Sequence, residues 1–184
     1  MSTIIDTILA RRSIRSYTNQ DLEVEKIDLL LQAAMAAPSA VNSRPWEFVV
    51  VTDKDRLWRL RTRLPFGRHN APAAIVVCGN ERIASNPAAK LFWVQDCSAA
   101  AENILIAAAG LGLGAVWVGL YPTPIAALVK NLLDIPGHVN PLCVIYVGYA
   151  AESKPPRTQY DAQRVHWQHY GQPEQPNGAA GAES

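Results

Sequence analysis

Three arginines and two serines lie close together near the start of the chain, as Arg11, Arg12, Ser13, Arg15 and Ser16. Guanidinium groups match phosphate oxygens two at a time, and serine hydroxyls or backbone N–H groups can satisfy the remaining oxygens. The alternative is a solvent-exposed helix end whose arginines interact with the carbonyl pole of the helix. Isolated basic clusters usually lie on the surface, so the segment alone leaves both interpretations open.

A second polar cluster follows in the sequence Pro38-Ser39-Ala40-Val41-Asn42-Ser43-Arg44-Pro45-Trp46. Two prolines, two serines and an asparagine between a predicted helix and a predicted strand indicate a stiff turn with many hydrogen-bonding groups. Such a loop can simply redirect the chain, or it can hold the polar edge of a ligand.

Other signatures of chemistry are missing or misplaced. Gly110, Gly112 and Gly114 follow a predicted helix and precede a strand, whereas a dinucleotide fingerprint needs strand, loop and helix in that order. We interpret them as a helix C-cap and tight turn. His166, His169 and the three cysteines lack metal-ligand spacing, and no Gly-x-Ser-x-Gly motif occurs. We therefore predict no metal site and no protein nucleophile, so that a cofactor carries the chemistry.

Composition indicates an ordinary globular protein. The chain has 184 residues, a formal net charge of +1 and 49% hydrophobic residues, so nothing in its charge favours nucleic acid or membrane partners. Its cysteines, Cys78, Cys97 and Cys143, are far apart and sit in apolar stretches, which is typical of buried, reduced thiols. With no secretory signal or membrane span in view, we expect the cytoplasm.

The pattern of apolar residues predicts the elements that position these clusters. Helices are expected over 3–11, 22–37, 53–63, 89–109 and 123–133, with Asp53 and Thr123 as N-caps, and strands over 46–52, 73–79, 115–119 and 142–149. These elements predict an α+β fold, a central mixed or antiparallel sheet of four to five strands with helices on both faces. We expect one domain over residues 1–170 and a disordered tail over 171–184.

In this order and at this spacing, the segments resemble the nitroreductase family of flavoproteins. The resemblance spans about Thr3 to Tyr170 and depends on the basic motif, the polar loop, Gly112-Leu113-Gly114, Val116-Trp117-Val118-Gly119, Gly148-Tyr149 and Arg157. It implies bound FMN, an NADPH or NADH donor, and an intertwined homodimer with the flavin at the interface. The apolar helix predicted over 89–109 suits such a dimer, because it has more apolar surface than one small sheet can cover.

The resemblance also assigns roles to residues. Arg11, Ser13 and Arg15, with help from Arg12 and Arg157, would take the phosphate and ribityl chain. Backbone groups around Val118 and Gly119 would face the flavin ring near N5. Pro38, Ser39, Ala40 and Asn42 would come from the other subunit. Trp93 or Phe92 would either line the substrate face or simply pack.

The implied activity is reduction of nitroaromatics, quinones or similar acceptors by ping-pong hydride transfer through flavin N5. The alternatives are an FMN-dependent reductive dehalogenase, a flavin-modifying relative, or a flavin-binding protein without turnover. Two departures from the family leave contacts open. Arg44 stands where the family commonly has Gln, so it could favour a negatively charged reduced flavin or an acidic substrate, or it could point to solvent or pair with Glu47. The polar contact to the ring from Arg63, Arg68 or Asn70 stays unassigned.

Overall fold

The computed structural model describes residues 3–172. Five α-helices lie in this part of the chain: α1 (Ile4–Ala10), α2 (Val24–Met35), α3 (Lys54–Arg63), α4 (Ala89–Gly110) and α5 (Ile125–Leu132). The strands are β1 (Trp46–Val51), β2 (Ala73–Gly79), β3 (Gly114–Gly119) and β4 (Asn140–Gly148), and short 3-10 turns cover Ala40–Asn42 and Ala162–Arg164. The α+β class expected from the sequence is confirmed.

The four strands form one sheet in the order β1-β2-β4-β3. All three ladders are antiparallel, so the sheet is antiparallel rather than mixed. β3 is an edge strand, and beside its outer edge Ser13 forms an isolated parallel bridge with Ala115. This bridge places the basic motif next to the start of β3.

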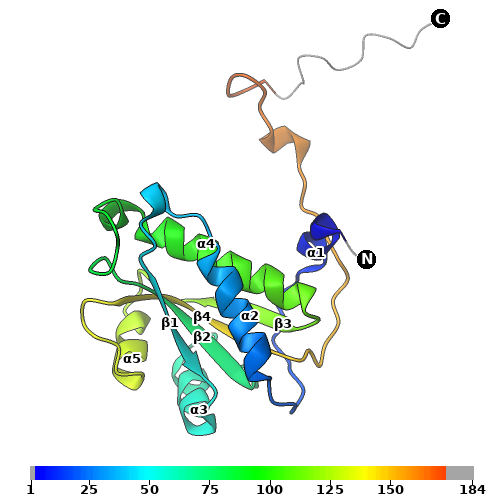
Figure 1. Cartoon of the computed structure of the whole chain (residues 1–184). Coiled ribbons are helices and arrows are strands. Elements are labelled where there is room, and N and C mark those ends of the chain that lie inside the picture. Colours follow the sequence, from blue (N-terminus) through cyan, green and yellow to red (C-terminus); the bar gives the residue numbers. More distant parts are fainter. Residues whose placement is uncertain (1–2, 173–184) are drawn as a thin grey trace, which may run out of the picture.

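Helices cover both faces of the sheet, as the sequence predicted (Figure 1). Alternation along β2 divides the core, because successive side chains of a strand face opposite sides. Ile75 and Val77 pack with α2 and α4, whereas Val76 and Cys78 pack with the α3 and α5 side. β2 is buried at all seven positions, which explains its unbroken apolar sequence.

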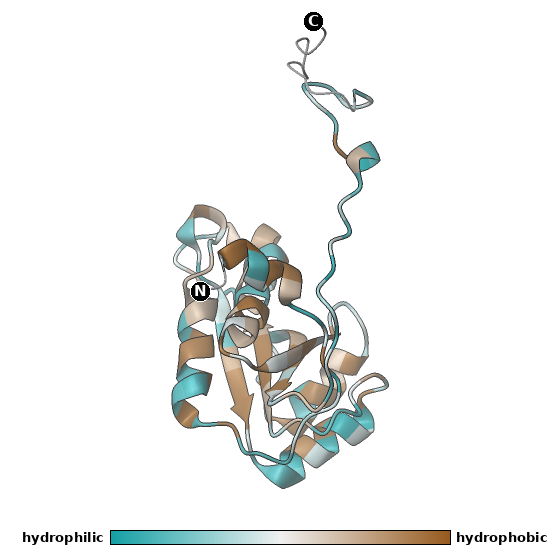
Figure 2. Cartoon of the chain, turned by 90° about the vertical axis from the view of Figure 1, so that its right-hand side faces the viewer, coloured by the Kyte–Doolittle hydropathy of each residue, from teal (hydrophilic) through white to brown (hydrophobic). Residues whose placement is uncertain are grey.

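The two ends of the chain meet near the motif before the C-terminal segment leaves the body. Tyr17 bridges Ala150 just after β4, and the Arg157 N–H donates to the Leu9 carbonyl at 3.3 Å. Beyond this point the chain continues as an extended arm that projects away from the sheet and helices (Figures 1 and 2). Most of the tail predicted to be disordered, residues 173–184, lies outside the described residues.

Two predicted helix ends are corrected. Thr123 does not cap α5: Pro124 holds that position, and the Thr123 hydroxyl donates to the Leu120 carbonyl at 2.5 Å, closing the preceding turn. Gly110 belongs to α4, and the left-handed residue after the helix is Gly112, with φ of +71°. No helix within residues 3–172 is long and apolar enough to cross a bilayer.

Candidate functional site

The basic motif is fixed to the sheet through its backbone. The Ile14 N–H donates to the Ala115 carbonyl at 3.0 Å, and the Ile14 side chain is buried against β3. A Cβ added at Gly114 would lie only 2.6 Å from Ile14 Cγ2, so a glycine is required there for this close approach. Side chains on either side of Ile14 are thereby held at the edge of β3.

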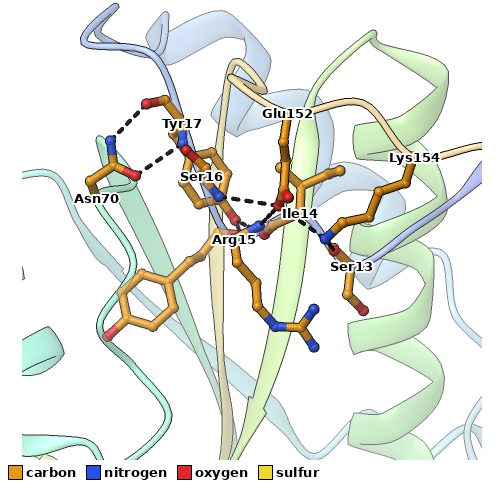
Figure 3. Close-up of polar contacts among 9 residues, drawn as sticks. Ser13, Ile14, Arg15, Ser16, Tyr17, Asn70, Glu152 and Lys154 are labelled. Carbon is orange, nitrogen blue, oxygen red and sulfur yellow. Dashed lines mark hydrogen bonds and ion pairs between the residues drawn. The ribbon is translucent and has the colours of Figure 1, made fainter.

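Two charged residues after β4 hold the same motif from the other side (Figure 3). The Glu152 carboxylate accepts from the Arg15 N–H at 2.5 Å and from the Ser16 N–H at 3.3 Å. Lys154 Nζ donates to Glu152 at 3.0 Å and to the Ser13 carbonyl at 2.7 Å. The Arg15 N–H and Lys154 lower the pKa of Glu152 below its ordinary value. Neither residue was identified from the sequence, because nothing local marks them as partners of the motif.

The guanidinium groups of the motif have different surroundings. Arg11 lies 3.6 Å from Glu102 on α4, and Arg12 donates to the Pro155 carbonyl of the arm. The Arg15 guanidinium extends away from Glu152 and, within the described chain, has no hydrogen-bond or ion-pair partner (Figure 3). In the same view the Ser13 hydroxyl and the Arg15 guanidinium lie on the same side, away from Glu152.

The late arginine is brought close to the motif only by its backbone. Arg157 follows Pro155, the residue that Arg12 contacts, and its own N–H bonds to the end of α1. Its side chain is exposed and pairs with no acidic group of residues 3–172. A cavity of about 210 Å³ lies beside this junction and is lined by Arg11, Arg12, Ile14, Gly114, Glu152 and Lys154.

Asn70, one of three residues left unassigned from the sequence, supports the end of the motif. Its amide donates to the Tyr17 carbonyl at 2.7 Å and accepts from the Tyr17 N–H at 3.0 Å. Tyr17 is buried, and its hydroxyl donates to the Ile14 carbonyl at 2.6 Å. Arg63 and Arg68, the other two, are exposed.

The polar loop after α2 adopts an unusual backbone. Val41, Asn42 and Arg44 have φ of 50°, 53° and 49°, in the left-handed region that residues other than glycine seldom enter. Val41 is β-branched and 79% exposed, so local packing does not explain its conformation. Strained backbone of this kind persists only where neighbouring groups enforce it, and it is concentrated at functional sites.

Asp96 of α4 holds the loop in this conformation by hydrogen bonds. Its carboxylate accepts from the Ala40 N–H and from the Ser43 hydroxyl, each at 2.8 Å, and both Asp96 and Ser43 are buried. The segment before α4 adds two more bonds, since Ser85 donates to the Asn42 carbonyl at 2.9 Å and Asn86 to that of Val41 at 2.8 Å. Four hydrogen bonds therefore hold the loop, and Asp96 is a third residue that the sequence did not reveal.

Several residues of the loop remain exposed to solvent in the single chain. Asn42 and Arg44 face outward, and Pro38 is exposed while Ser39 and Ala40 are half-buried. Arg44 forms no ion pair with Glu47, and the Glu47 carboxylate instead accepts from the Asn80 amide at 2.8 Å. No hydrogen bond or ion pair joins this loop to the basic motif within the part of the chain that the structure describes.

The outer edge of β3 offers backbone donors. Leu120 N–H donates to the Leu142 carbonyl of β4, so alternate residues, Gly119 among them, direct their N–H groups to the opposite edge. Val118 has its backbone turned toward β4 instead. Gly119 is exposed, and a Cβ there would meet nothing nearer than Trp117 Nε1 at 3.9 Å. A planar ligand could approach this N–H closely.

The remaining candidates, Trp93, Phe92 and Cys97, differ in burial. Trp93 is buried over Gly79 and makes an edge-to-face contact with Tyr121, with ring centroids 4.8 Å apart, whereas Phe92 is 43% exposed. Cys97 is fully buried in the core, as the sequence predicted, and this burial raises its thiol pKa. Residues 3–172 contain no cluster of three or more His, Cys, Asp or Glu able to hold a metal ion.

Comparison with known proteins identifies the family. The model of the nitroreductase family matches residues 8–64 and 62–149. The chain belongs to the nitroreductase family. It is 44% identical, over 166 residues, to a candidate NADH dehydrogenase/NAD(P)H nitroreductase of Methanothermobacter thermautotrophicus, a match that covers 89% of this chain and 85% of that protein. As a member of this family, the protein is an oxidoreductase.

Solved structures agree on the fold. A candidate NADH dehydrogenase/NAD(P)H nitroreductase from Parabacteroides distasonis superimposes with a TM-score of 0.85 at 43% identity, covering 92% of this chain and all of that one. A candidate nitroreductase from Desulfovibrio desulfuricans, solved in complex with FMN, has a TM-score of 0.72 at 30% identity and covers 86% of this chain and 92% of its own. Family members of this fold thus bind FMN.

Proposed function

We propose that this protein is an FMN-dependent NAD(P)H oxidoreductase that reduces nitroaromatics, quinones or similar acceptors. The observation that carries the proposal is the arrangement along β3. Ser13 and Arg15 stand at its start, where the Arg15 guanidinium has no partner among residues 3–172, and the Gly119 N–H, directed away from β4, stands at its end. Charged donors at one end suit a phosphate, and a backbone donor with open space before it suits a flat ring.

The spacing supports one ligand for both ends. Ser13 bridges Ala115, and the four residues from Ala115 to Gly119 advance roughly 13 Å at the usual rise of a strand. A ribityl phosphate chain joined to a flavin ring is a molecule of comparable extended length. The donor set and the space at Gly119 therefore fit FMN, held by Ser13, Arg15 and the edge of β3.

Other residues would complete the cofactor site. Arg11, Arg12 and Arg157 lie around the same junction, and the Arg12 guanidinium, which donates to the Pro155 carbonyl, is a further candidate phosphate ligand. When bound, FMN would supply hydride transfer at N5 between a nicotinamide donor and the acceptor, in a ping-pong cycle. The protein would hold the ring and exclude water, and we assign no side chain as nucleophile or general base.

We also propose a homodimer in which the polar loop of one protomer closes the flavin pocket of the other. Large apolar side chains lie exposed in the single chain, and none of the residues of α1 is buried. Tyr160 and Tyr170 of the arm are 74% and 93% exposed, and Val41 on the loop is 79% exposed. Apolar surface of this kind needs a partner, and a second copy supplies it symmetrically.

Residues 1–170 would then form one functional domain, working in the cytoplasm. Cys78, Cys97 and Cys143 are all buried and unpaired, which is consistent with a reducing compartment.

Anaerobic reduction tests the proposed activity. The purified protein should carry a yellow flavin that absorbs at roughly 450 nm, a property of the cofactor itself. NADPH or NADH should bleach it without oxygen, and a nitroaromatic or quinone should restore the colour. Flavin that binds but is never bleached by either nucleotide would refute the oxidoreductase mechanism.

A further inference from the structure

Glu152 is an acidic residue beside a cluster of cations that is proposed to bind an anion, a position that simple electrostatics disfavours. The basic motif presents its cations to an anion, yet this carboxylate lies directly against its backbone, 2.5 Å from the Arg15 N–H. A negative charge beside a phosphate site repels the phosphate. Within the described residues, Glu152 pairs with Lys154 and with backbone N–H groups, and with no guanidinium of the motif.

The contacts of Glu152 hold the backbone of the motif and thereby set where its side chains point. Two successive backbone N–H groups, those of Arg15 and Ser16, converge on one carboxylate oxygen. Lys154 donates to that same oxygen and to the Ser13 carbonyl, so the backbone is held on both sides of Ile14. With its backbone fixed there, Arg15 directs its guanidinium away from Glu152, toward the side that the Ser13 hydroxyl faces (Figure 3).

We propose that Glu152 is a positioning residue for the phosphate-binding motif, acting with Lys154 as a clamp on the backbone of residues 13–16. The clamp orders Ser13 and Arg15 before the ligand arrives, which lowers the entropy lost on binding. Lys154 also neutralises the carboxylate, so the repulsion of the phosphate is small. This inference rests on the proposed function, since it takes FMN phosphate as the ligand of the motif.

The two possible roles of Glu152, as a clamp or only as a charge, predict opposite changes in FMN affinity for Glu152→Gln. If the carboxylate acts only through its charge, its removal favours an anionic ligand and FMN binds more tightly. If it acts as a clamp, the motif loses its order. We then expect the FMN dissociation constant to rise by about tenfold, the effect of losing one charge-assisted hydrogen bond.

Riboflavin, which lacks the phosphate, provides the discriminating ligand. Both ligands are titrated into the flavin-free full-length protein, and quenching of flavin fluorescence gives each dissociation constant. We expect Glu152→Gln and Lys154→Met to weaken FMN and to leave riboflavin unchanged. The matched control is Glu23→Gln, which removes a carboxylate that is paired with Lys26 and hydrogen-bonded to Tyr149 but has no hydrogen bond or ion pair with residues 11–16. It should alter neither affinity.

Each other outcome counts against a specific claim. Equal or tighter FMN binding by Glu152→Gln would overturn the clamp, and so would an equal loss of riboflavin affinity, which would mark general damage to the pocket. If Glu152→Gln does not fold, judged by circular dichroism, Lys154→Met decides by the same two titrations. Wild-type protein that binds neither flavin would instead refute the proposed function.

Discussion

The Ser43 hydroxyl donates to the Asp96 carboxylate at 2.8 Å, and both groups are buried. This contact ties a loop of strained backbone to the central helix. Because the same carboxylate also accepts from the Ala40 N–H, Asp96 holds the loop at two points. The exposed face of the loop is thereby held in one conformation, as the proposed closure of a neighbouring pocket requires.

Replacing Asp96 should loosen this loop. Asp96→Ala leaves the buried Ser43 hydroxyl and the half-buried Ala40 N–H without acceptors, and we expect it to lower the free energy of unfolding by about 3 kcal/mol. Ser43→Ala removes one of the two bonds and should cost about 1 kcal/mol. Urea denaturation monitored by tryptophan fluorescence measures both. An Asp96→Ala variant as stable as the wild type would show that the contact does not anchor the loop.

Arg15→Ala should remove FMN and leave the fold intact. The guanidinium makes no contact that supports the described chain, so its loss should change the free energy of unfolding by less than about 0.5 kcal/mol. A charge-assisted pair with phosphate contributes about 1.5–3 kcal/mol, so affinity for FMN should fall at least about tenfold. Arg59→Ala, at an exposed position of α3, is the control. Full flavin occupancy of Arg15→Ala at low FMN concentration would contradict the phosphate assignment.

Glu152 should make stability depend on acid pH. Hydrogen bonds from the Arg15 N–H and from Lys154 hold its pKa below the ordinary value of 4.5. A depressed carboxyl pKa stabilises the folded state above the unfolded value, and this contribution is lost as the pH falls through the folded value. The difference in denaturation midpoint between wild type and Glu152→Gln should therefore be present at pH 7 and shrink below pH 4.5. A difference that stays constant to pH 3 would mean that the carboxylate charge is not involved.

Gly114→Ala should displace the basic motif from β3. The new methyl group would lie 2.6 Å from Ile14 Cγ2, and overpacking of this kind costs about 1–3 kcal/mol. Gly137→Ala is the matched control, since nothing lies within 4 Å of its Cβ position. Thermal unfolding of both variants, followed by FMN titration, compares them. We expect only Gly114→Ala to lose stability and flavin affinity, and equal behaviour of the two variants would argue against close packing at Ile14.

The cysteines should be inert in the native protein. Burial raises the pKa of Cys78 to about 12 and raises that of Cys97 and Cys143 as well, so few thiolates form at neutral pH. Iodoacetamide should label none of the three in the folded protein and all three in urea, as counted by mass spectrometry. Rapid labelling of Cys97 without denaturant would show that α4 is more open than the structure indicates.

Local patterns predicted the elements well. The apolar run of β2 gave its residue range, and Asp53 was correctly placed as the cap of α3, where its side chain accepts from the Arg56 N–H. Thr123 was placed wrongly, because its hydroxyl is taken by the carbonyl of Leu120. A preference for capping does not reveal which nearby group competes for the same hydroxyl.

The residues that support the site were beyond the reach of sequence patterns. Asp96 contacts partners 53 and 56 positions away, and Glu152 contacts the motif across 137 positions. Only the folded chain brings such pairs together. The residues next to Asp96 and next to Glu152 in the sequence give no sign of these contacts. Asp96 in particular is one of two acidic residues on α4, with Glu102, and its role depends on a loop that it contacts only in the folded chain.

Native mass spectrometry of the full-length protein with FMN tests the central claim most directly. The account predicts a dimer that carries two FMN molecules, one for each phosphate motif, and a dimer with lower flavin occupancy for Arg15→Ala when FMN is limiting. A monomer, or a wild-type protein that remains without flavin at saturating FMN, would contradict it.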